Sequence, residues 1–146
     1  MLQDLLLAHP LPENLHVLPT TRAARTGLAL SSRNAYLTRS ELEVAPVLYR
    51  ALSAAHKLWE QGRTTGEDLV QACGAIVRDE QERLRTHGSE VIIRVDYFEL
   101  FDRFTFQPVR GDVESETMKA EMVLVGAIWV GKTRLIDNIL LGWKVD

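Results

Sequence analysis

The chain has 146 residues, of which 46% are hydrophobic and 25% are charged, with 9 glycines and 5 prolines. These values are typical of one globular domain and exclude collagen-like and low-complexity sequence. Lysine and arginine together number 17 against 20 for aspartate and glutamate, and the net charge of −3 argues against a dedicated nucleic-acid-binding protein. The single cysteine, Cys73, excludes an internal disulfide and leaves too few ligands for a Cys/His zinc site. We expect Cys73 in the core.

The apolar runs are too short to cross a membrane. The longest are Leu5–Ala8 and Met122–Val130, and a transmembrane helix needs about 20 such residues. The first residues also lack the basic segment and the long apolar segment of a signal peptide. We therefore expect a protein with no membrane partner and a cytoplasmic location.

The first eight residues predict the last turns of a helix, because Leu2, Leu5 and Leu6 share one helical face. Pro10 and Pro12 stop any helix there. A domain seldom opens on the end of a helix. We therefore predict that residues 1–13 are the tail of a preceding unit and that residues 14–146 form the main domain.

Two helices are predicted in the first half of that domain. Thr38 and Glu41 form a capping box, and apolar residues then follow the helical period as far as Trp59, with a kink expected at Pro46. A second helix is predicted from Thr64, with Glu67 at the box position, to a glycine at position 88. The two helices should pack together as a hairpin.

The second half predicts strands. Residues 91–98 alternate between Val91, Ile93, Val95 and Tyr97 on one face and the intervening residues on the other. Residues 121–130 are apolar on both faces, which favours a central strand, and residues 134–141 predict a third strand after a turn at 131–133. The predicted fold class is therefore α+β, a helical hairpin packed on a small antiparallel sheet.

Residues 126–133 match the phosphate-binding P-loop pattern G-x-x-x-x-G-K-[ST]. The interior of the match is bulky and strand-like, and the thirteen residues after Thr133 leave no room for the helix and parallel strands that such a loop needs. We interpret Lys132 as a solvated turn residue and keep nucleotide binding at 126–133 as a distant alternative.

A more plausible phosphate-binding segment is residues 27–34, Gly-Leu-Ala-Leu-Ser-Ser-Arg-Asn. Two hydroxyl groups and a planar guanidinium in one loop can grip phosphate oxygens. The same residues are also common in ordinary turns, so composition alone leaves both interpretations open.

The sequence resembles the C-terminal domain of pantothenate synthetase (pantoate–β-alanine ligase). The resemblance runs through the chain in four segments, which are Leu28–Leu37, Ala45–Tyr49, Val95–Leu100 and Gly131–Asn138. In the last segment we interpret Arg134 and Asp137 as structural residues that pair or satisfy backbone groups near the hairpin.

The resemblance implies an ATP-dependent ligase that joins pantoate and β-alanine through a pantoyl adenylate. Its C-terminal domain, here residues 14–146, closes over the phosphates of ATP, which is bound with Mg²⁺. Residues 1–13 would then be the tail of the family's N-terminal nucleotide-binding domain. By matching position, Leu30, Ser31, Ser32 and Arg33 would contact ATP, and Ser32 and Arg33 would act in catalysis. Thr21 would lie near the adenine end, at a position where the family usually has a small apolar residue.

The chain departs from the family pattern in two places. Residues 23–27 run one residue longer than usual and lack a carboxylate, and no counterpart of the family's N-terminal half is found. That half holds most of the pantoate and β-alanine pockets, so we expect the chain alone to be inactive. The alternative is a non-catalytic module that docks on a separate nucleotide-binding subunit.

Overall fold

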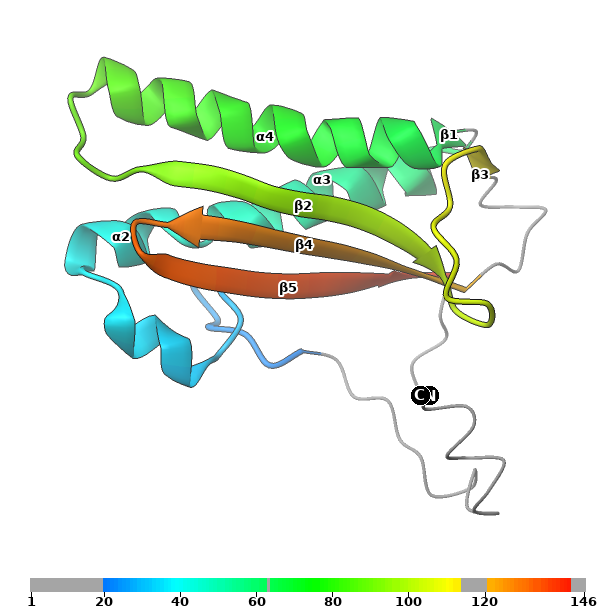
Figure 1. The fold of residues 1–146 in the computed structure, drawn as a ribbon, viewed down its shortest axis with the longest axis horizontal. Coiled ribbons are helices and arrows are strands. Elements are labelled where there is room, and N and C mark those ends of the chain that lie inside the picture. Colours follow the sequence, from blue (N-terminus) through cyan, green and yellow to red (C-terminus); the bar gives the residue numbers. More distant parts are fainter. Residues whose placement is uncertain (1–19, 63, 114–120, 143–146) are drawn as a thin grey trace, which may run out of the picture.

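The computed structural model describes residues 20–62, 64–113 and 121–142, and the predicted tail of residues 1–13 lies outside them. The described part has two layers, with two long helices packed on one face of an antiparallel sheet (Figure 1). The helices are α3 (Val47–Glu60) and α4 (Gly66–Thr86), and the strands are β2 (Ile93–Asp102), β4 (Met122–Val130) and β5 (Thr133–Leu141). The predicted α+β class is confirmed.

The first helical segment begins where the sequence predicts. The hydroxyl of Thr38 accepts the backbone N–H of Glu41 at 3.3 Å, and the Glu41 carboxylate accepts the backbone N–H of Thr38 at 2.8 Å. This capping box starts α2 (Arg39–Val44), and Pro46 then separates α2 from α3. Proline lacks a backbone N–H, so the predicted kink is a break between two successive helices.

The start of α4 lies one residue later than predicted. Thr65, not Thr64, is the N-cap, and its box partner is Asp68 rather than Glu67. The cause is a two-stranded ladder in which β1 (Thr64–Thr65) pairs with β3 (Asp112–Val113). Thr64 takes part in this ladder, so the helix can begin only after it. The end of α4 is as predicted, with Gly88 in a left-handed conformation.

The sheet has the order β2-β4-β5, which confirms β4 as the central strand. The predicted alternation of β2 is only partly right, because the register shifts between Val95 and Tyr97. A bulge of this kind exchanges the two faces of a strand. Ile93 is buried before it, but Val95 is exposed, and beyond it Phe98 and Leu100 point into the core.

The core lies between the helical layer and the sheet. Its largest fully buried side chains include Leu52 of α3, Leu69 of α4 and Leu124 of β4. Cys73 is buried there as predicted, and burial raises the pKa of its thiol to about 12. In the described part of the chain, no helix is long and apolar enough to cross a membrane.

Candidate functional site

The predicted phosphate-binding segment lies at the edge of the sheet beside β5 (Figure 1, blue to cyan). Two apolar residues hold its ends against the core. Leu28 is partly buried and packs on the core cluster, and Leu37 is buried just before α2. The eight residues between these anchors therefore cross the edge of the domain with fixed ends.

Between the anchors the chain turns outward. Leu30 is 60% exposed, and Ser31, Ser32 and Arg33 are also exposed. A short 3₁₀-helix, η2 (Ser32–Tyr36), follows, and the Ser31 hydroxyl accepts the backbone N–H of Arg33 at 3.2 Å. This hydrogen bond uses Ser31 as an acceptor, so its O–H proton remains available to a ligand.

Among the described residues, no acidic side chain forms an ion pair with Arg33, which lines the small cavity beside η2. The structure also brings Thr21 next to this segment, because the backbone N–H of Leu30 donates to the Thr21 carbonyl at 2.9 Å. The five residues that sequence matching selects as ATP contacts therefore lie together on one exposed edge.

Sequence reasoning missed the contacts that hold this segment to the sheet. The Arg22 guanidinium donates to both oxygens of the Asp137 carboxylate, at 2.5 and 3.0 Å. It also donates to the backbone carbonyls of Gly27 and Asn138, each at 3.2 Å. Its central carbon lies 4.0 Å from the centre of the Tyr49 ring on α3. One arginine thus connects the segment to both layers.

Arg134 and Asp137 both form ion pairs, but not with one another. Arg134 of β5 pairs with Asp96 of β2 at 2.7 Å, across the central strand β4. Asp137 is 4% exposed and pairs with Arg22, which is 115 residues away along the chain. No local pattern in the sequence could have indicated that pair.

Asn34 is a second residue that sequence reasoning left without a role. Its side-chain amide donates to the carbonyl of Ala29 at 3.0 Å, across the turn that carries Ser31 and Arg33. Its other polar atom, Oδ1, is buried and has no partner among the described residues. A cavity of about 30 Å³ lies here, lined by η2, α3 and β5.

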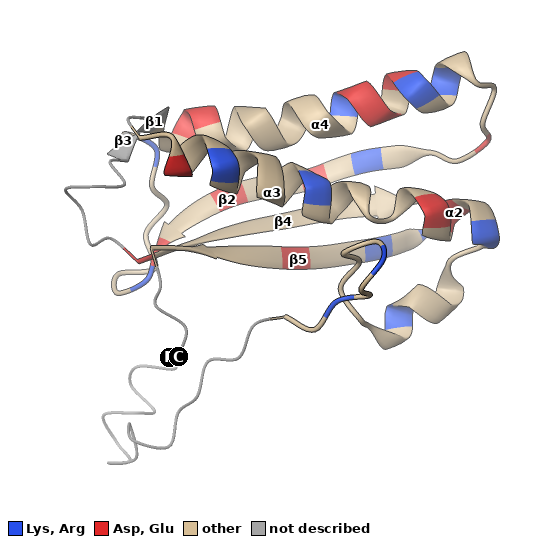
Figure 2. Ribbon diagram, turned by 180° about the vertical axis from the view of Figure 1, so that it is seen from behind, with Lys and Arg blue, Asp and Glu red and all other residues tan. Residues whose placement is uncertain are grey.

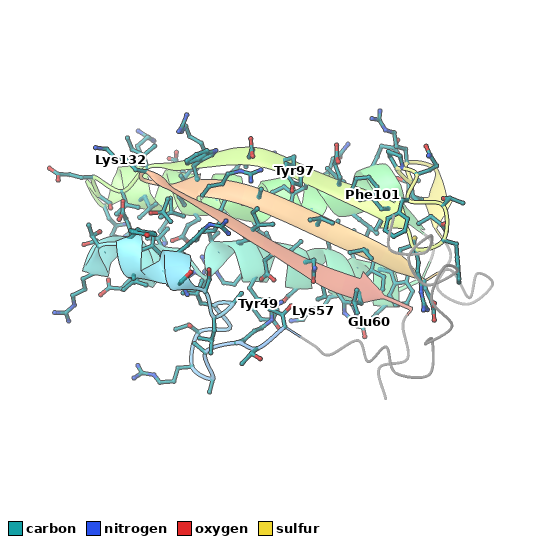
Figure 3. All side chains as sticks on the ribbon, turned by 60° about the horizontal axis from the view of Figure 1, so that its bottom comes forward. Tyr49, Lys57, Glu60, Tyr97, Phe101 and Lys132 are labelled. Carbon is teal, nitrogen blue, oxygen red and sulfur yellow. The ribbon has the colours of Figure 1, made fainter. Side chains whose placement is uncertain are left out.

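The P-loop alternative at residues 126–133 is wrong. Residues 131 and 132 form the two-residue turn of the β4–β5 hairpin, with Gly131 at a φ of 57°. The N–H of Gly131 donates to the carbonyl of Ile92, so it is not free for a phosphate. Figure 3 shows Lys132 at the tip of this hairpin, while Tyr49 lies on α3 beside the candidate segment.

The candidate segment lies within a basic stretch of the chain. Residues 20–40 contain four arginines and neither aspartate nor glutamate, although the whole chain is acidic. Figure 2 shows the basic positions in blue along the chain that leads to α2. Arg22 is paired with Asp137, and Arg39 lies 3.8 Å from Glu43. Arg25 and Arg33 form no ion pair with the described residues, and their positive charge at an exposed edge favours an anionic ligand such as a polyphosphate.

Comparison with known proteins identifies the family. A sequence model of the family described as pantoate-beta-alanine ligase matches residues 1–140. The chain belongs to this family. The match covers the candidate segment and the hairpin in one alignment.

Individual relatives agree with this assignment. The chain is 38% identical over 132 residues to the pantothenate synthetase of Herpetosiphon aurantiacus, and this match covers 90% of the chain. It is 39% identical over 141 residues to a bifunctional pantoate ligase/cytidylate kinase of Synechococcus, covering 97% of the chain. The crystal structure of pantothenate synthetase from Thermus thermophilus superimposes with a TM-score of 0.63 at 31% identity over 87% of the chain.

The ligase relatives are much longer than the region that this chain matches. The matched region is 42% of the Herpetosiphon protein, 22% of the Synechococcus protein and 39% of the Thermus protein. The family match favours a role in a ligase over the non-catalytic docking module. Within the described part of this ligase-family chain, no group of three His, Cys, Asp or Glu side chains could hold a metal ion.

Proposed function

We propose that residues 14–146 are the ATP-closing C-terminal domain of an ATP-dependent ligase that joins pantoate and β-alanine to form pantothenate. Residues 1–13 would be the tail of the nucleotide-binding domain. Membership of the pantoate–β-alanine ligase family supports the reaction. The observation that carries the site is the exposed segment Leu30–Arg33, held between the anchors Leu28 and Leu37.

The reaction has two steps, and the candidate segment would act in the first. A pantoate carboxylate oxygen attacks the α-phosphorus of ATP, the bond to the β-phosphate oxygen breaks, and pantoyl adenylate and pyrophosphate form. The amine of β-alanine then attacks the acyl carbon and releases AMP. Negative charge builds on the pyrophosphate as it departs, so a positive group placed there lowers the barrier.

Arg33 is proposed as that positive group. Its planar guanidinium can donate two parallel hydrogen bonds to phosphate oxygens, and it makes no competing ion pair with the described residues. Ser31 and Ser32 would orient the same oxygens with their hydroxyl groups. Thr21, held next to Leu30, would lie toward the adenine end, and Mg²⁺ would arrive bound to the ATP phosphates.

Pantoate and β-alanine are proposed to bind mainly to the rest of such a ligase. The 146 residues correspond to about two fifths of the Herpetosiphon and Thermus proteins. A sample of these residues alone should therefore form no pantothenate from pantoate, β-alanine and Mg-ATP. Product formation by the purified chain would contradict this part of the proposal.

The phosphate contacts can be tested on the chain as it is. In an NMR titration of the ¹⁵N-labelled chain with Mg-ATP, we expect the backbone amides of residues 30–33 to shift, even at millimolar affinity. Shifts confined to residues 131–133, or none at residues 30–33, would contradict phosphate binding by this segment. The docking alternative would be supported instead if the chain captured a separate nucleotide-binding subunit while residues 30–33 showed no response to Mg-ATP.

A further inference from the structure

Asp137 is a buried carboxylate that lines the same cavity as Ser31 and Arg33 of the candidate phosphate-binding segment. It lies on β5, on the face that turns toward the helices, and its side chain is 4% exposed. The guanidinium of Arg22 binds both of its oxygens, and Oδ1 also accepts the backbone N–H of Asn138 at 2.8 Å. A buried carboxylate left without its cation is costly, so the position of Arg22 is strongly fixed.

Arg22 in turn fixes the start of the segment. Its side chain binds the carbonyl of Gly27, and its backbone forms an antiparallel bridge with Ala29. Two further backbone bonds close the same turn, from Ala23 N–H to the Leu28 carbonyl and from Leu30 N–H to the Thr21 carbonyl, each at 2.9 Å. Thr21 and Leu30 are thus held together by a turn that Arg22 ties to β5.

Tyr49 completes this arrangement from the helical side. Arg22 stacks over its ring, and Gly27 packs against the ring edge. A Cβ atom at Gly27 would lie 2.3 Å from Cδ1 of Tyr49, and the φ of Gly27 is +73°, so only glycine fits here without a shift. The turn is therefore clamped between β5 and α3.

We propose that Asp137 is a positioning residue for the phosphate-binding segment and that it acts through Arg22. Asp137 itself touches no ATP. It holds the turn of residues 21–30 at the sheet edge, so that residues 30–33 leave the domain from a fixed point. The consequence for ATP rests on the function proposed above, whereas the ordering of the turn does not.

The proposal predicts a local effect of Asp137→Asn, which keeps the size of the side chain and removes its charge. The amides of Ala23 and Leu30 should exchange with solvent about tenfold faster or more, because the bond to a charged partner that holds their turn is weakened. Amides of the central strand β4 should change by less than about threefold. Unchanged exchange at Ala23 and Leu30 would overturn the proposal.

A matched control separates this effect from general destabilisation. Glu80 of α4 is also a buried carboxylate, 5% exposed, and it is bound by Arg50 and Arg83 at 2.8 and 2.5 Å. Glu80→Gln should leave the exchange of Ala23 and Leu30 unaltered relative to β4. Equal acceleration at these two amides in both variants would also overturn the proposal.

A double variant tests whether Asp137 acts through Arg22. Arg22→Gln alone should loosen the turn at least as much as Asp137→Asn does, because it also leaves the buried carboxylate without its cation. It provides the same test if Asp137→Asn fails to fold. Adding Asp137→Asn to Arg22→Gln removes that unpaired charge, so it should not accelerate the exchange of Leu30 by more than about twofold. A full additive effect would contradict action through Arg22.

The Mg-ATP titration distinguishes this inference from the proposed function. If both hold, Asp137→Asn weakens Mg-ATP binding at residues 30–33 by about threefold or more, while Glu80→Gln leaves it unchanged. If the turn loosens in Asp137→Asn but the parent chain shows no ATP shifts at residues 30–33, the positioning role stands and the proposed function fails. Weaker ATP binding without faster exchange would overturn the positioning role.

Discussion

The two-layer core and the edge segment of residues 20–37 are built in opposite ways. The core is apolar and continuous, and side chains such as Leu52, Leu69 and Leu124 are fully buried. In the edge segment Leu37 is buried and Leu28 is partly buried, whereas Leu30 and Tyr36 are 60% and 78% exposed. Polar contacts, chiefly those of Arg22, hold it in place. The difference shows that the fold and the candidate chemistry depend on different residues, so their substitutions should have separable effects.

The largest effect on stability should come from truncation in the core. Leu52→Ala removes a fully buried side chain of α3 and should lower the free energy of unfolding by about 3 kcal/mol. Leu30→Ala makes the same chemical change in the edge segment and should cost less than about 0.5 kcal/mol. Urea denaturation of both variants measures these free energies of unfolding. Equal decreases in the two variants would contradict the distinction between the core and the edge segment.

Gly27→Ala should have the next largest effect, because it acts where the edge segment touches the core. The new methyl group would overlap the Tyr49 ring, and the expected cost is about 1–3 kcal/mol. Gly88→Ala is a matched control, since Gly88 also has a positive φ of 65° but nothing within 4 Å of the added atom. It should cost about 1 kcal/mol from backbone strain alone. Thermal denaturation measures the stability of both variants. Equal decreases in Tm would contradict a contribution of the Tyr49 contact.

A smaller effect is expected from pH through Glu80. Its hydrogen bond from Arg83, together with Arg50, holds the pKa of the Glu80 carboxyl below its ordinary value of 4.5, although burial opposes this shift. The ionised form therefore stabilises the fold above about pH 4.5, and this contribution is lost as the pH falls through the lowered pKa. Glu80→Gln should flatten the acid dependence of unfolding. The exposed pair formed by Glu82 and Arg85 should contribute far less, so Glu82→Gln serves as the control.

Local sequence patterns were enough to predict most of the core. The capping box at Thr38 and the apolar character of β4 act over a few residues, and both predicted the correct elements. The errors came from contacts between distant segments. Because Thr64 pairs with Val113, α4 begins one residue later than predicted. The bulge beside Val95 depends on the pairing of β2 with its partner strand β4.

The same distinction holds for the candidate site. The exposed segment of residues 30–33 could be selected from the family resemblance and its basic, hydroxyl-rich composition. The Arg22–Asp137 pair could not, because the two residues are 115 positions apart and no local pattern joins them. Only the folded structure shows that β5, in the second half of the chain, holds the turn of residues 21–30 in the first half.

The smallest effect on stability, and the most direct test of the account, concerns Arg33. Arg33→Ala should change the free energy of unfolding by less than about 0.5 kcal/mol, because the side chain is exposed. The same variant should weaken binding of Mg-ATP, followed by NMR at residues 30–32, by about tenfold or more. Lys132→Ala, at the hairpin tip, should leave that affinity within about twofold of the parent chain. Loss of ATP affinity on Lys132→Ala, with Arg33→Ala unaffected, would contradict the account.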